Sequence, residues 1–142
     1  MQTLRIARTR DRLESSGPRP VRPTDLSPLV GAWANFDESS TGIARLEIAD
    51  RAGALIVRTW GSGTPEPHDW GEVTGDAFTD GVALHAAVAF LADYDLGFAR
   101  VRLACYLNKR LLVVDAYTVF VDGSGRSPCF RRDHFYVPGE RA

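Results

Sequence analysis

The stretch "FARVRLACYLNKRLLVVDAYTVFV" (98–121) decides the fold. It contains two apolar, β-branched runs, 98–107 and 111–121, on either side of the turn residues Asn-Lys-Arg. In the first run Arg100 and Arg102 alternate with apolar residues, which is the period of a strand whose two faces differ. Two such runs joined by a short turn predict an antiparallel hairpin.

The same pattern of short runs and turns continues on both sides of this hairpin. The Ala-rich run 82–92 is compatible with a helix, but its alternation favours a strand that is apolar on both faces. The predicted strands are 30–36, 43–48, 54–60, 70–78, 82–92, 98–107, 111–121 and 129–137. Regular strands joined by short turns predict an all-β, eight-stranded antiparallel up-and-down barrel, because closure removes exposed edges.

The chain of 142 residues fits one domain. We expect a flexible basic N-terminal tail over 1–28, a barrel domain over 29–138 and a C-terminal tail over 139–142. The first 25 residues carry six arginines against three acidic residues. A solvated leader is the favoured interpretation of this arm, and binding of an acidic partner is the alternative.

Composition excludes several classes of protein. A net charge of −1 argues against a nucleic-acid partner. No apolar run approaches the ~18 residues of a membrane helix, and the N-terminus lacks the apolar region of a signal peptide. We therefore expect a cytoplasmic protein. Cys105 and Cys129 fall on strands about 10 Å apart, too far for a disulfide.

No motif for a metal or a cofactor is present in the sequence. His68, His85 and His134 lack metal-ligand spacing. The Gly-Ser-Gly stretches at 61–63 and 123–125 lack the spacing of a phosphate loop. The sequence therefore predicts neither a metal site nor a cofactor.

Acid–base chemistry is the open catalytic possibility. Asp115 and Tyr117 share one face of the most apolar strand, where a carboxylate is costly to bury unless it is paired. An outward ion pair with Arg100 or Arg102 is the favoured interpretation, and a buried general acid or base of raised pKa is the alternative. The candidates for proton transfer are Asp115, Tyr117, His85 and His134.

Two registers of the barrel are possible. If Arg102, Tyr106, Asp115 and Tyr117 face inward, they line a polar cavity. If the arginines face outward, the interior is almost pure hydrocarbon, which burial cost favours. That interior would be lined by Ala44, Leu46, Ile48, Leu55, Val57, Thr59, Val101, Leu103, Cys105, Leu112, Val114 and Phe120. It would be either a packed core or a pocket for an apolar ligand.

The loop in "WGSGTPEPHDWGEV" (60–73) joins two predicted strands and should lie at the mouth of the barrel. Its tryptophans would cap the barrel or stack on a ligand, and His68 would be able to shuttle protons. A structural cap is the favoured interpretation. The candidate substrate-binding residues are Trp60, His68, Trp70, Phe90, Tyr94, Arg102, Tyr106 and Phe120.

Four short motifs lie along residues 29–137: Gly31-x-Trp33, Thr41-Gly42-Ile43, Asp69-Trp70-Gly71 and "FVDGSGR" (120–126). The first resembles the G-x-W signature of lipocalins and other calycin barrels. Together the motifs resemble a family of small actinobacterial lipocalin-like barrel proteins. The resemblance implies a framework role for Trp33, Trp70 and the turn 122–126, and it implies no catalytic residue.

Barrels of this kind are similar to proteins of specialised metabolism. The resemblance therefore implies a cofactor-independent cyclase or isomerase, of Diels–Alder or Pictet–Spengler type, acting on a small hydrophobic or aromatic substrate inside the barrel. The alternatives are a non-catalytic small-molecule-binding barrel and a packed barrel that acts through its surface. An edge left open by incomplete closure would allow a homodimer.

Overall fold

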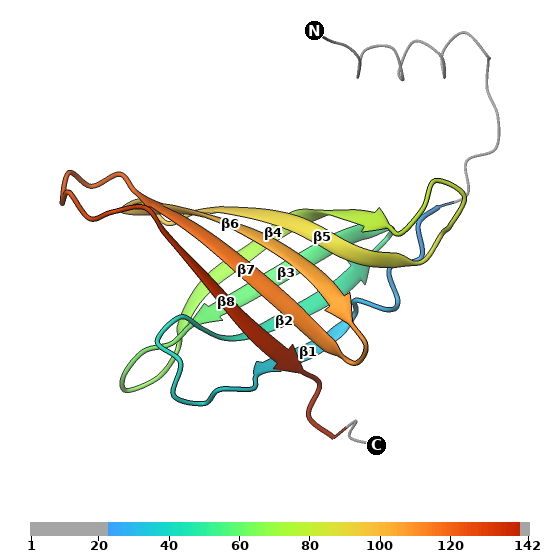
Figure 1. Ribbon diagram of the computed structural model, residues 1–142, viewed down its shortest axis with the longest axis horizontal. Coiled ribbons are helices and arrows are strands. Elements are labelled where there is room, and N and C mark those ends of the chain that lie inside the picture. The colour runs from blue at the N-terminus through green and yellow to red at the C-terminus, as the bar shows by residue number, and fades with distance from the viewer. Residues whose placement is uncertain (1–22, 140–142) are drawn as a thin grey trace, which may run out of the picture.

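The computed structural model describes residues 23–139 and forms a closed barrel of eight antiparallel strands in up-and-down order (Figure 1). The strands are β1 (Gly31–Asn35), β2 (Ile43–Arg51), β3 (Ala54–Gly61), β4 (His68–Thr79), β5 (Ala87–Asp95), β6 (Ala99–Asn108), β7 (Leu111–Phe120) and β8 (Cys129–Tyr136). The predicted fold class and the hairpin of β6 and β7 are confirmed. Among the described residues, no helix is long and apolar enough to cross a membrane.

Two strands begin more than one residue away from their predicted starts. β4 begins at His68 because its ladder with β3 continues to Gly61. β5 begins only at Ala87, and residues 82–86 belong to the connection from β4. The physical reason is that the N-terminal segment takes backbone hydrogen bonds of residues 85 and 87. Asp25 donates its backbone N–H to the carbonyl of His85, and the Asp25 carbonyl accepts from the N–H of Ala87.

That N-terminal segment closes one end of the barrel. Leu26 and Leu29 are buried, and the indole N–H of Trp33 donates to the Leu29 carbonyl at 3.0 Å. The predicted tail boundary is therefore too late, since 23–28 pack with the barrel. The rest of the predicted basic tail (1–22), and residues 140–142 of the C-terminal tail, lie outside the described residues.

The core confirms the register with outward arginines. Leu46, Val57, Leu103 and Leu112 are fully buried inside the barrel. Each such leucine contributes about 1.5–3 kcal/mol to stability relative to an exposed one. Of the predicted interior residues, Ala44 is only half-buried, because an irregularity in the β2–β3 register turns Ile43 inward instead. Phe120 is also half-buried and lies at the open end.

The ladder between β1 and β8, which closes the barrel, is short. β8 pairs with β1 only through Tyr136 and Phe135, whereas it pairs with β7 along its length from residue 129. The first half of β8 therefore has one strand neighbour among the described residues. The β1–β2 loop (residues 36–42) lies beside that half of β8, and this arrangement shapes the open end of the barrel.

Candidate ligand cavity at the open end of the barrel

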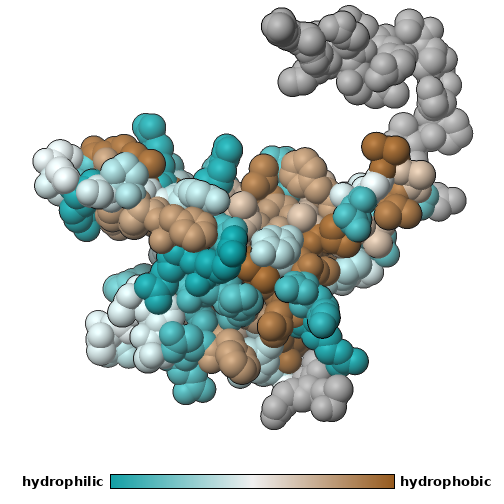
Figure 2. Space-filling model, viewed as in Figure 1, coloured by the Kyte–Doolittle hydropathy of each residue, from teal (hydrophilic) through white to brown (hydrophobic). Residues whose placement is uncertain are grey.

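A cavity of about 880 Å³ occupies the end of the barrel opposite Leu26 and Leu29. The β1–β2, β3–β4, β5–β6 and β7–β8 connections surround it. Figure 2 shows the indentation on the left, between the projecting β7–β8 loop and the loops below it. Apolar and aromatic side chains dominate its walls: Ile43, Val101, Val114, Ala116, Trp70, Leu96, Phe98 and Phe120. Volumes of roughly 300–1,000 Å³ are typical of small-molecule pockets.

The cavity exists because inward side chains become smaller toward this end. Along β7 the inward side chains shrink from Leu112 through Val114 to Ala116, and Thr118 and Phe120 follow at the mouth. On β6, Leu103 and Val101 are likewise followed by Ala99. Larger side chains fill the closed half of the barrel, and the small residues Ala99 and Ala116 leave space behind the aromatic mouth.

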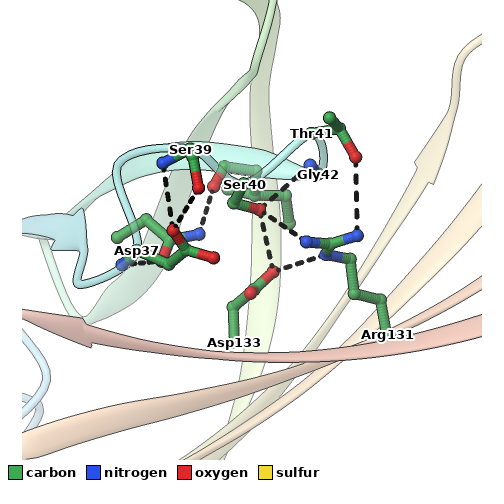
Figure 3. A network of polar contacts seen from close by, with 9 residues as sticks. Asp37, Ser39, Ser40, Thr41, Gly42, Arg131 and Asp133 are labelled. Carbon is green, nitrogen blue, oxygen red and sulfur yellow. Dashed lines mark hydrogen bonds and ion pairs between the residues drawn. The ribbon is translucent and has the colours of Figure 1, made fainter.

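One ion pair projects into the rim of the cavity. Side chains alternate along β8, so Arg131 and Asp133 point to the same side as the fully buried Phe135. The Arg131 Nε donates to Asp133 Oδ2 at 3.0 Å, and the Arg131 guanidinium also donates to Ser40 Oγ at 3.0 Å. Figure 3 shows both side chains rising from β8 toward the β1–β2 loop. Asp133 is mostly buried, with 13% of its side chain exposed.

The β1–β2 loop fits closely against this pair. A Cβ on Gly42 would lie 2.8 Å from Arg131 Cδ, so the backbone approaches as near as a glycine allows. Within the loop, Asp37 accepts hydrogen bonds from the hydroxyl and the backbone N–H of Ser39, which lower the pKa of Asp37. The loop and the first half of β8 are therefore joined by side chains where strand pairing is absent.

Trp70 forms the wall opposite the ion pair. Its ring meets Tyr94 edge-on at 5.3 Å between centroids. A Cβ on Gly61 would lie 2.7 Å from Trp70 Nε1, so the indole lies against the bare backbone of β3. The Tyr94 hydroxyl is within hydrogen-bond distance of the carbonyls of Val57 and Gly71, at 3.0 and 2.9 Å. These contacts hold Trp70 in one position.

Several predicted site residues lie on the outer face of the barrel. Asp115 accepts two hydrogen bonds, of 2.6 and 2.8 Å, from Arg132 of β8. Its predicted partners Arg100 and Arg102 are not used, because Arg102 pairs with Asp93. The outward positions of β6, β7 and β8 also hold Tyr106, Tyr117 and His134.

Of the remaining predicted residues, some line the cavity and the others lie elsewhere in the barrel. His68, Trp70 and Phe120 line the cavity. Trp60 instead lies between Arg45 and Arg58, whose guanidinium carbons are 4.1 and 5.0 Å from the ring centroid. His85 lies at the closed end of the barrel, Phe90 lies in the buried core, and Tyr94 packs against Trp70.

Arg131 and Asp133 were not among the predicted site residues. The alternation of "CFRRDHFYV" (129–137) contains the signal, because it places both on the face of Phe135. Apolar burial alone predicts that Arg131 and Asp133 face solvent. Their inward position depends on the short β1, which leaves the first half of β8 beside a loop.

The two cysteines have different environments. Cys105 is buried in the core, and burial raises the pKa of its thiol. Cys129 is exposed at the rim of the cavity. Both are free thiols. Among residues 23–139, no group of three or more His, Cys, Asp or Glu side chains could hold a metal ion.

No known family model matches this chain, and no curated protein or solved structure is significantly similar to it. The structure thus establishes a closed eight-stranded barrel with a cavity at one end, and the cavity is the starting point for a function.

Proposed function

We propose that this protein binds a small apolar or aromatic molecule in the cavity at the open end of the barrel. The observation that carries the proposal is a cavity of about 880 Å³ with mostly apolar walls and the Arg131–Asp133 ion pair at its rim. Trp70, Phe98 and Phe120 offer aromatic faces to a flat ligand. The likeness of the Gly31-x-Trp33 frame to lipocalin-like barrels supports the same class of function.

The binding test uses the two cysteines. A naphthalene carrying a hydroxymethyl group is the probe, and alkylation by iodoacetamide is the readout. Cys129 borders the cavity, so a bound probe should slow its alkylation severalfold. Cys105 is buried, and its raised pKa keeps it unreactive in the folded state. The reaction therefore reports on one site.

Two variants of β7 make the test specific. Ala116→Phe places a ring in the cavity and should abolish protection of Cys129 by the probe. Val119→Phe adds the same ring on the outer face of the same strand, and should leave protection unchanged. Equal alkylation rates with and without the probe, in a folded wild-type protein, would refute the proposal.

A cofactor-free cyclase or isomerase is the second candidate function. It is favoured by Asp133 and His68, which bring proton-transfer groups to a mostly apolar chamber. Binding is the better-supported function, because Asp115, Tyr117, His134 and His85 do not border this cavity.

The catalytic candidate is tested with nitrobenzisoxazole, whose ring opens when a base removes one C–H proton and the N–O bond breaks. Turnover above background that falls in Asp133→Asn or in His68→Ala would support catalysis. Probe binding without such turnover would leave a binding protein.

A further inference from the structure

We propose that the Arg131–Asp133 pair makes the cavity selective for an uncharged ligand with one hydrogen-bonding head group, and against its acidic and basic analogues. The inference rests on the proposed binding function and specifies its ligand class. It concerns residues on the inner side of β8, which form the only ion pair among residues 23–139 whose two partners both line the cavity.

The pair is electrically neutral as a unit. Arg131 Nε and Asp133 Oδ2 are 3.0 Å apart, and Ser40 Oγ is 3.0 Å from the guanidinium and 3.5 Å from the carboxylate. The wall therefore presents donors and acceptors side by side and no net charge. Thr41 Oγ1, at 3.5 Å from Arg131, adds a second hydroxyl.

The other carboxylates that border the cavity have partners of their own. Asp69 is bound by Arg58 of β3, whose Nε is 3.3 Å away, and by the backbone N–H of Gly71 at 2.8 Å. Asp95 accepts from the backbone N–H of Gly97 at 3.0 Å. Arg58 neutralises Asp69, and Asp95 is exposed to solvent, where water screens its charge.

Desolvation then decides between ligands. A carboxylate head beside Arg131 would also face Asp133, and an ammonium head beside Asp133 would also face Arg131. A charge that leaves water without a net partner is strongly disfavoured. A hydroxyl head accepts from Arg131 and donates to Asp133 or Ser40, so all its hydrogen bonds are met.

The test compares three matched naphthalenes that carry a hydroxymethyl, a carboxylate or an aminomethyl group at the same ring position. Affinities are measured by titration calorimetry at about pH 8, above the ordinary pKa of histidine. We expect the alcohol to bind wild type about tenfold more tightly than either charged analogue.

Variants of the pair should change this order in opposite directions. Asp133→Asn leaves Arg131 without its carboxylate, so the acid should become the tightest ligand. Arg131→Gln leaves the Asp133 carboxylate, so the amine should become the tightest ligand. Should one single variant fail to fold, the other still tests the selectivity, because each predicts a different tightest ligand.

Asp93→Asn and Arg102→Gln are the matched controls, because this exposed Arg–Asp pair lies on the outer face. They change the net charge equally and should preserve the wild-type order. If no probe binds folded wild type, the proposed function fails. If the probes bind but their order of affinity in Asp133→Asn and Arg131→Gln is the same as in wild type, the binding function stands and the selectivity is refuted.

Discussion

Asp115 of β7 and Arg132 of β8 face each other across one pair of the ladder, joined by hydrogen bonds of 2.6 and 2.8 Å on the outer face of the barrel. Only 10% of the Asp115 side chain is exposed, against 49% for Arg132. The carboxylate raises the pKa of Arg132, first through hydrogen bonding and then through charge. The most apolar strand therefore holds its acid as one half of an outward pair.

Asp115→Asn should lower the free energy of unfolding by about 1–3 kcal/mol, because a charge-assisted pair with a mostly buried carboxylate is lost. Asp93→Asn removes a carboxylate from an exposed ion pair and should lower the free energy of unfolding by about 1 kcal/mol or less. Urea denaturation compares the two. Probe affinity should not change in Asp115→Asn. A large loss of affinity would mean that Asp115 contributes to the ligand site.

Leu26→Ala should destabilise the protein by about 2–5 kcal/mol, because Leu26 is buried at the closed end of the barrel. The nearby control Val30→Ala removes a side chain that is 41% exposed and should have a small effect. Thermal unfolding measures both. Equal effects would mean that residues 23–28 do not belong to the folded domain.

Gly61→Ala should displace Trp70, since the new Cβ would lie 2.7 Å from its Nε1. The backbone of Gly61 has no positive φ, so the effect should come from the indole alone. We expect a shift in tryptophan fluorescence and weaker binding of the hydroxymethyl naphthalene. An unchanged affinity would mean that Trp70 does not contribute to ligand binding.

The turn of the β7–β8 loop should loosen in strong acid. Hydrogen bonds from Ser124, together with the Arg126 guanidinium, lower the pKa of Asp122 from 3.8 to about 2. A depressed folded-state pKa means that the stabilisation is complete above pH 3.8 and is lost as pH falls through about 2. The amide resonance of Ser124 should report this midpoint. A midpoint near 4 would contradict the assigned contacts.

The sequence by itself determined the architecture. Alternation in 98–121 predicts the β6–β7 hairpin, and burial cost predicts that Arg100 and Arg102 face outward. Both are local or single-strand properties, so no long-range information is needed. The same reasoning predicts the apolar interior of β3 and β6.

Only the tertiary structure decided which residues meet at the cavity. The partner of Asp115 is Arg132 rather than Arg102, because cross-strand pairing depends on register, and Asp93 already holds Arg102. The inward ion pair of Arg131 and Asp133 depends on how far the short β1 reaches along β8. Periodicity fixes the face of each strand, but contacts between strands far apart in sequence arise only when the barrel closes.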